Sequence, residues 1–155
     1  MLTLVHIADL HLGAEYAFLP EEKAAVCREA QFQLLERVLE HAGNISAEVI
    51  LVAGDLFDSP TPPAAVTNRA FSILGKARRP VLISPGSHDY LGAKSPYLTM
   101  PLPENVFVFQ SNRLTPYFLH PDTVIWGAAF TGPSAFIPLD APIDPQHLNV
   151  LSMHG

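Results

Sequence analysis

Residues 49–58, with the sequence VILVAGDLFD, contain the pattern that decides the fold. An apolar and largely β-branched run ends abruptly at Gly54, which predicts a strand that is buried on both faces, as in parallel sheets. Gly54 allows the backbone to turn where the strand stops, so Asp55 lies at the carboxyl end of the strand. Open α/β sheets bind their ligands at this end, and a metal ion is a common partner for a carboxylate there.

Two further apolar runs, residues 2–8 and residues 80–84, are also expected to be strands. Between the three strands, residues 20–42 and 64–74 carry apolar residues at the period of amphipathic helices. The order strand, helix, strand, helix, strand predicts parallel strands that are joined by right-handed crossovers. All three strands are therefore expected to end at one edge of the sheet.

The first helix is expected to bury Ala30, Leu34 and Val38, which recur every four residues, with Cys27, Leu35 and Leu39 widening the apolar stripe. Gly43 suits the position that follows a helix end. The single cysteine, Cys27, lies in the same helix and is interpreted as a small buried hydrophobic residue rather than a nucleophile.

The second half of the chain has a different character, because most of the fifteen prolines follow residue 79. Proline interrupts helices, so long helices are not expected there. Short strands, antiparallel in part, are expected instead at residues 106–109, 116–119 and 124–128, with a last strand at residues 149–153.

Composition bounds the class of protein. Hydrophobic residues make up 48% of the 155 residues, which indicates a folded domain rather than a disordered chain. The net charge of −6 argues against a free-standing nucleic-acid-binding domain, which would normally carry a basic face. A single cysteine, an N-terminus without the basic region of a signal peptide and no apolar run near the roughly 20 residues that span a bilayer predict a cytoplasmic protein with no membrane segment.

Side chains that bind metal ions follow the ends of the three strands. They are Asp9, His11, Asp55, Asp58, His88 and Asp89. Asp9 and His11 are two residues apart, so in extended backbone their side chains point to the same side. Carboxylates and imidazoles suit first-row divalent ions such as Mn²⁺, Fe²⁺ or Zn²⁺. A carboxylate that can bridge two ions predicts a two-metal site, which stabilises in-line attack at phosphorus.

Four short blocks in this order resemble the calcineurin-like metallophosphoesterase superfamily. They are Asp9-x-His11, residues 54–58 (GDLFD), residues 86–89 (GSHD) and His154-Gly155. The flanking sequence HIADLHLG at residues 6–13 is similar to SbcD-type DNA double-strand-break repair nucleases and their bacterial relatives. The resemblance implies an α/β fold, a β-sandwich flanked by helices. Residues 1–155 are expected to be the N-terminal part of such a nuclease domain, incomplete at its C-terminus.

The resemblance also implies the metal ligands. Asp9, His11 and Asp55 would hold the first of two divalent ions, with Mn²⁺ expected ahead of Fe²⁺ or Zn²⁺. Asp55 would bridge to the second ion, which His154 and Ser87 would also bind. The family has asparagine where this chain has Ser87, and a hydroxyl is a poorer metal ligand, so the second site is expected to be weakened. A later Gly-His-x-His block of the family does not occur in these residues, so this chain is expected to be weak or inactive by itself.

Three residues are expected to act on the substrate by the same resemblance. His88 would be the acid near the leaving oxygen, Asp89 would orient His88, and Asp58 would lie at the rim of the site. An imidazolium can stabilise a leaving group in this way.

The first functional hypothesis is metal-dependent phosphodiester hydrolysis, by the DNA exonuclease subunit of an SbcCD-like repair complex. The resemblance implies DNA as substrate, an SMC-like ATPase subunit as partner and a homodimer. A second hypothesis is a small-molecule phosphodiesterase or phosphatase of the same superfamily. The third is a degenerate, non-catalytic domain used for assembly, which Ser87 and the missing block would favour.

Overall fold

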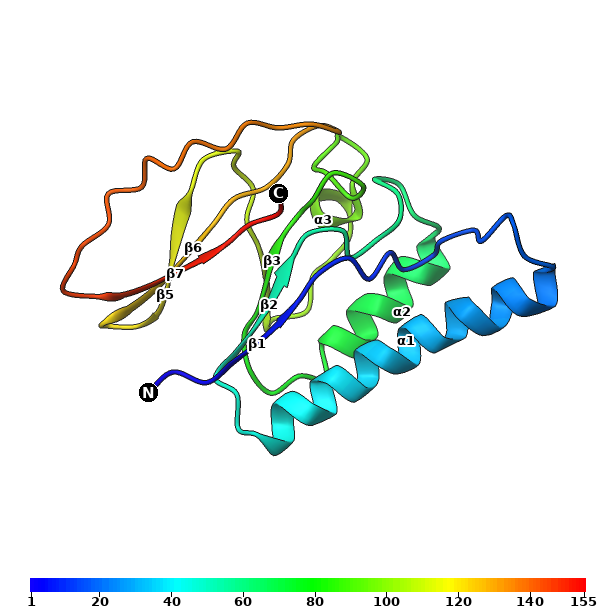
Figure 1. Ribbon diagram of the computed structural model, residues 1–155, viewed down its shortest axis with the longest axis horizontal. Coiled ribbons are helices and arrows are strands. Elements are labelled where there is room, and N and C mark those ends of the chain that lie inside the picture. The colour runs from blue at the N-terminus through cyan, green and yellow to red at the C-terminus, as the bar shows by residue number, and fades with distance from the viewer.

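A four-stranded parallel sheet lies at the centre of the protein, whose structure is a computed structural model of residues 1–155 (Figure 1). The strands lie side by side in the order β1 (Leu4–Ile7), β2 (Val49–Ala53), β3 (Val81–Ser84) and β4 (Val106–Val108). The parallel pairing of the first three strands is confirmed. β4 also pairs in parallel, so the antiparallel pairing expected in part of the second half begins only after it.

A second sheet of three strands packs against the first. Its order is β5 (Thr115–His120), β6 (Thr123–Gly127) and β7 (Leu148–Ser152). β5 and β6 form an antiparallel hairpin, and β7 lies parallel to β6. The strands predicted in this half are confirmed with small shifts at their ends. Two sheets, with helices on the outer face of the first, give the β-sandwich that the family resemblance implied.

Two long helices cover the outer face of the parallel sheet, α1 (Glu21–Asn44) and α2 (Ala64–Leu74) (Figure 1). A third, α3 (Pro96–Thr99), is a single turn between β3 and β4, and the sequence did not predict it. No helix of the structure combines the length and the apolar character needed to cross a membrane.

The face of α1 that packs on the sheet differs in part from the one predicted. Leu34 is 45% exposed and Ala30 is also exposed, whereas the buried residues are Ala24, Phe32, Leu35 and Ala42. A helix has 3.6 residues per turn, so residues spaced strictly by four rotate steadily away from one face. Leu35 and Leu39, which widened the predicted stripe, do pack on the core, whereas the prediction of Ala30 and Leu34 as core residues was wrong.

The end of α1 is also formed differently. The helix continues through Gly43 to Asn44, and the left-handed residue beyond it is Ser46, with φ of 52°. Arg79, from the loop after α2, donates hydrogen bonds from Nη1 to the carbonyl oxygens of Ala42 and Ala47. The carbonyl group of Ala42 is one of those at the helix end that lack partners within the helix, and Ala47 lies beyond the helix, so this guanidinium ties the end of α1 to the segment that follows it.

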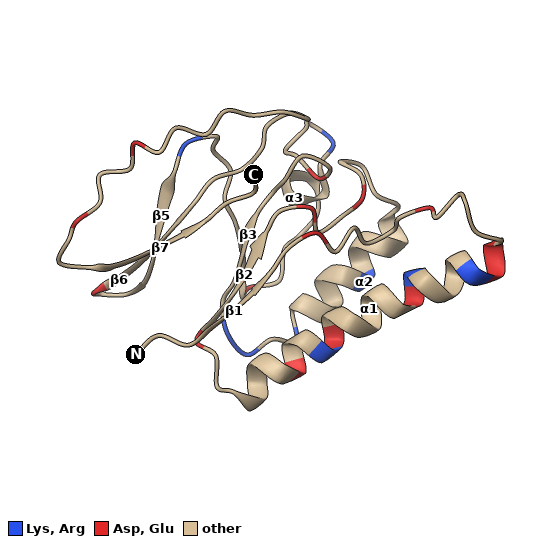
Figure 2. Cartoon of the chain, viewed as in Figure 1, with Lys and Arg blue, Asp and Glu red and all other residues tan.

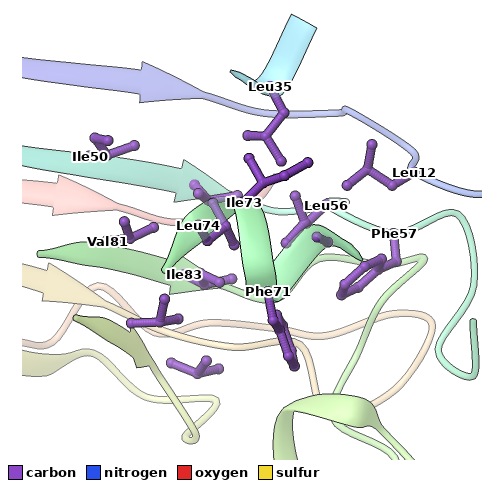
Figure 3. Close-up of a cluster of buried hydrophobic side chains, with 14 of the residues drawn as sticks. Leu12, Leu35, Ile50, Leu56, Phe57, Phe71, Ile73, Leu74, Val81 and Ile83 are labelled. Carbon is purple, nitrogen blue, oxygen red and sulfur yellow. The ribbon is translucent and has the colours of Figure 1, made fainter. Parts of the chain in front are cut away.

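β2 lies at the centre of two cores because it is buried on both faces, as its sequence predicted. Ile50 and Val52 belong to the larger cluster, which lies on the side of the helices and includes Leu35 and Leu74. Figure 3 shows Ile50 with these two residues. Val49 and Leu51 point the other way and pack with residues of the second sheet. Successive side chains of a strand point to opposite faces, so one strand supplies both layers.

The close contact between the two sheets leads to a prediction about Gly127. A Cβ atom at this position would lie 2.1 Å from the ring of Phe109, which is fully buried between the sheets. Gly127→Ala is expected to lower the free energy of unfolding by about 1–3 kcal/mol, the usual cost of overpacking a core. Urea denaturation followed by circular dichroism would measure the change.

Gly132→Ala is the matched control, because an added Cβ there would meet nothing nearer than the carbonyl oxygen of Ser134 at 3.7 Å. Its unfolding free energy is expected to be unchanged or slightly higher, since alanine restricts the unfolded chain. Equal unfolding free energies for the two variants would contradict this view of the sheet interface.

Candidate metal centre

Four segments meet at the carboxyl edge of the parallel sheet. Three of them follow β1, β2 and β3, and the fourth follows β7, which brings the C-terminal end next to the end of β2 (Figure 1). The side chains that the sequence placed in a common site all lie on these segments. They are Asp9, His11, Asp55, Asp58, Ser87, His88, Asp89 and His154.

Three of these residues have left-handed backbone conformations that are uncommon outside glycine. The φ angles are 55° at Asp9, 47° at His11 and 52° at Asp55, and each costs about 1–2 kcal/mol. Hydrogen bonds between the two loops hold them, since the amides of Asp9 and His11 donate to the carbonyl oxygens of Gly54 (3.1 Å) and Asp55 (3.0 Å). Strained non-glycine residues of this kind cluster at functional sites.

The carboxylate of Asp55 has two oxygens with different surroundings. Oδ1 accepts a hydrogen bond of 2.9 Å from the backbone amide of His88, which fixes the orientation of the group. Oδ2 lies 3.8 Å from Nε2 of His11, 3.6 Å from Nε2 of His154 and 3.5 Å from Oγ of Ser87. The side chain is only 5% exposed. One buried oxygen therefore faces ligand atoms from three other segments.

His11 is held by a second carboxylate. Its Nδ1 lies 3.1 Å from Oδ1 of Asp58, and an ionised carboxylate can only accept, so Nδ1–H is the donor. Nε2 then presents its lone pair toward Asp55. Metal-binding histidines almost always donate their other ring N–H to a group of this kind, which fixes the tautomer. The structure thus gives Asp58 a direct contact with a predicted ligand, in addition to its place at the rim.

His88 lies beside the same carboxylate but is more exposed. Its Nδ1 is 3.3 Å from the backbone oxygen of Asp58 and 4.0 Å from Oδ1 of that residue. Its ring meets the ring of His11 edge-on, with 4.6 Å between centroids. Half of the His88 side chain is exposed to solvent. A group with this exposure can reach a substrate that approaches from solution.

His154 reaches the site because Gly54 leaves room for it. Gly54 has φ of +90°, and a Cβ there would lie 2.3 Å from Nδ1 of His154. Nδ1 lies 3.3 Å from the backbone oxygen of Ala53, so the N–H at this position donates to the carbonyl and Nε2 faces Asp55. Oγ of Ser87 is 3.5 Å from Nε2 of His154. These two side chains approach Asp55 together, and both belong to the ligand set that the resemblance implies for a second ion.

Asp89 has different partners from those expected. It makes no hydrogen bond with His88, because its carboxylate points into the protein, where it is 1% exposed. Five donors surround it: the phenol of Tyr97 (2.5 Å) and the backbone amides of Gly86 (2.7 Å), Leu56 (2.9 Å), Asp55 (3.2 Å) and Phe57 (3.3 Å). Asp89 therefore fixes the loop that carries Asp55 rather than the imidazole of His88.

Burial determines the protonation of this pair. It raises the pKa of the Asp89 carboxyl above its ordinary value, and hydrogen bonds from Tyr97, Gly86 and Phe57 oppose that rise. Burial also raises the pKa of Tyr97 well above its ordinary value, and the negative charge of Asp89 adds to the effect. Tyr97 therefore keeps its proton and remains a hydrogen-bond donor.

Sequence reasoning did not identify Tyr97 or Ser84 as part of the site. Oγ of Ser84, at the end of β3, donates a 2.7 Å hydrogen bond to the carbonyl oxygen of Ser152 and so joins β3 to β7 two residues before His154. Ser84 acts on a strand of the other sheet, and Tyr97 reaches from α3 back to the buried carboxylate of Asp89. No motif contains either residue, so no signal in the sequence could have identified them.

The donor set at this edge fits a divalent cation. The ligand atoms of Asp9, His11 and Asp55 lie within 4.8 Å of one another, and those of His11, Asp58 and His88 do so as well. Acidic residues mark the loops beyond the strands in Figure 2. A surface cavity of about 380 Å³ beside His88 is lined by Asp58, Ser87 and Tyr90, among others, and by no lysine or arginine. Clustered carboxylates and imidazoles without a basic partner suit a metal ion.

Known proteins with similar sequences include phosphoesterases and nucleases. The sequence model of calcineurin-like phosphoesterases matches residues 2–155. Over 116 residues, or 71% of the chain, it is 32% identical to YhaO, an uncharacterized metallophosphoesterase of Bacillus subtilis. Over 92 residues, or 57% of the chain, it is 36% identical to the DNA double-strand break repair protein Mre11 of Aeropyrum pernix and 30% identical to a subunit of the nuclease SbcCD of Escherichia coli K12. The matched segment covers 28%, 21% and 21% of these relatives, respectively.

The hydrogen bond from Tyr97 to Asp89 can be tested by removing one oxygen atom. Tyr97→Phe keeps a ring that packs against Phe57 and Phe71 but leaves the buried carboxylate with one donor fewer. The free energy of unfolding is expected to fall by about 1.5–3 kcal/mol, the usual contribution of a hydrogen bond to a charged group. Urea denaturation would measure it.

Tyr117→Phe is the matched control, since this tyrosine is only half-buried and lies in β5, away from Asp89. Its stability is expected to stay close to that of the unaltered protein. If Tyr97→Phe were no less stable than Tyr117→Phe, Asp89 would not depend on the phenol as described.

Proposed function

This chain belongs to the calcineurin-like phosphoesterase family, and on that premise we propose that its metal centre hydrolyses phosphodiesters, with DNA as the substrate. The observation that carries the proposal is the buried Oδ2 atom of Asp55, which faces His11, His154 and Ser87 within 3.8 Å. A single carboxylate oxygen in contact range of ligands from separate segments is suited to bridge two cations. Two-metal sites of this kind serve phosphoryl chemistry.

The residues fall into two ligand sets. Asp9, His11 and Asp55 would hold one ion, and Asp55, Ser87 and His154 would hold the other. We expect Mn²⁺ in both, and weaker binding at the second position because a serine hydroxyl is a poor ligand. Bound ions would supply a nucleophilic water at neutral pH and stabilise the negative charge on phosphorus.

Several groups support this chemistry by positioning the ligands. Asp58 holds His11 in the tautomer that leaves Nε2 free, through the 3.1 Å contact at Nδ1. Asp89 fixes the loop of Asp55 through its five donors, and the amide of His88 orients the Asp55 carboxylate. Ligands placed in advance in this way keep the reacting atoms aligned, and small displacements are costly to rate.

His88 is proposed as the proton donor to the leaving oxygen. Its ring is half exposed and borders the cavity beside Asp58, so Nε2 can approach a phosphodiester in that cavity. Nδ1 is engaged by the backbone oxygen of Asp58 at 3.3 Å, which leaves Nε2 for the substrate. Proton transfer by a positioned histidine commonly contributes 10²–10⁴-fold in rate, as an order of magnitude.

DNA is favoured as substrate by the names of two relatives, a double-strand break repair protein and a nuclease subunit. From the resemblance of the four sequence blocks we also propose an SMC-like ATPase subunit as partner and a homodimer, and from the composition a cytoplasmic location. A second candidate is a small phosphodiester. The net charge of −6 and the absence of lysine and arginine from the cavity lining favour it, because they provide no track for a DNA backbone.

Metal binding can be tested apart from activity with the Asp55→Asn variant. Titration calorimetry with Mn²⁺ is expected to show that the amide lowers affinity at least about tenfold, since one anionic ligand of both proposed positions is lost. The control is Asp140→Asn, an exposed carboxylate paired with Arg113. Unchanged Mn²⁺ affinity in Asp55→Asn would refute the ligand assignment.

The substrate can be tested with the purified chain in Mn²⁺, using linear duplex DNA and bis(p-nitrophenyl) phosphate. Slow hydrolysis of both is expected, and His88→Asn should reduce kcat about 10²–10⁴-fold. His41→Asn, an exposed histidine of α1, is the control and should retain activity. Cleavage of the small ester alone would favour the second candidate. Mn²⁺ binding without hydrolysis of either substrate would favour a non-catalytic role in assembly.

A further inference from the structure

The loop that carries Asp9 and His11 lies against α1, and one side chain of that helix holds it there. Nε2 of Gln31 donates hydrogen bonds of 2.9 Å to the carbonyl oxygens of both Leu10 and His11. Figure 1 shows this loop passing from the end of β1 over the helices. We propose that Gln31 is a positioning residue that keeps the backbone of Asp9 and His11 in the conformation that binds metal.

The chemistry of the contact requires an amide nitrogen. Both neighbours of the Gln31 head group are carbonyl oxygens, which only accept, so the NH₂ end must face them. A carboxylate would place an oxygen against two others, and an apolar side chain would leave both carbonyls without this donor. Leu10 makes no other hydrogen bond through its carbonyl oxygen, whereas His11 also accepts one from the amide of Ala14 at 3.1 Å.

The two sides of the loop are held by different groups. On one side, the amides of Asp9, His11 and Leu12 donate to the loop after β2. On the other side, Gln31 donates hydrogen bonds to the carbonyl oxygens of Leu10 and His11. This double attachment holds Asp9 and His11 at φ values of 55° and 47°, which the backbone does not favour. The same backbone sets the position of Nε2 of His11, 3.8 Å from Asp55.

Gln31 also lowers the stability of the fold through one buried polar atom, and this indicates a functional role. Its Oε1 atom is buried and has no hydrogen-bond partner, and an unsatisfied buried acceptor is destabilising. Its neighbour Phe32 and nearby Leu35 are buried hydrophobic residues, so an apolar side chain would suit this face of α1. A residue that breaks a local rule without benefit to packing is expected at a functional site.

The inference rests on the proposed metal site. Two measurements on the full chain test the role of Gln31 and the existence of the metal site separately. The variants are Gln31→Met, Gln31→Leu and the control Gln33→Met, whose glutamine lies on the exposed face of the same helix near Glu29. Without metal, amide hydrogen exchange of residues 9–12 is compared. With Mn²⁺, affinity is measured by titration calorimetry, and thermal unfolding monitors the fold.

Both Gln31 variants are expected to exchange residues 9–12 faster and to bind Mn²⁺ about 10–100-fold more weakly, as for other partners of metal ligands. Their melting temperatures should shift by less than about 5 °C, and Gln33→Met should match the unaltered protein. Unchanged exchange, or faster exchange with unchanged Mn²⁺ affinity, would overturn the inference. If the unaltered protein bound no Mn²⁺, the proposed function would fail, and equal exchange rates would then separately show that Gln31 does not hold the loop.

Discussion

The buried carboxylate of Asp89 is the interaction on which the rest of the site depends. Four backbone amides and the phenol of Tyr97 donate to it, and the amides belong to the loops after both β2 and β3. A buried charge is tolerated only when its hydrogen-bonding capacity is filled. The two loops therefore both bind the carboxylate of Asp89. These hydrogen bonds fix the backbone that carries the side chains of Asp55 and His88. Its neighbour Asp55 can then present a single oxygen to the proposed ligands.

The parallel sheet supplies the frame for this arrangement. β2 is buried by the helices on one face and by the second sheet on the other, so its position along the sheet is set from both sides. Backbone hydrogen bonds between the segments after β1 and β2 continue the pairing beyond the ends of the strands. The two loops are therefore held to each other in the same way as the strands. The left-handed residues of those loops, Asp9, His11 and Asp55, are held by this frame rather than by their own preference.

The electrostatics of the edge explain why a cation suits it. Asp9, Asp55 and Asp58 bring carboxylates to the edge, and His11 and His154 turn ring nitrogens toward Asp55. Arg69 lies away from this edge, where its guanidinium pairs with Glu29 and joins α2 to α1. A divalent ion would neutralise the carboxylates and bring the positive charge that a phosphodiester requires.

The sequence by itself determined the parallel strands, the crossover helices and the edge at which the site residues gather. These follow from local patterns: a doubly buried strand reads as a continuous apolar run, and parallel strands must end together. It determined the buried face of α1 only in part: Leu35 packs on the core, but Ala30 and Leu34 are exposed, because a four-residue repeat fits a 3.6-residue helix over a short stretch only. Only the tertiary structure decided the partners of Asp89, the contact of Asp58 with His11, and the parts that Tyr97, Ser84 and Gln31 play. Each of these depends on groups from separate segments that meet when the sheet and helices pack, and no local pattern encodes such a meeting.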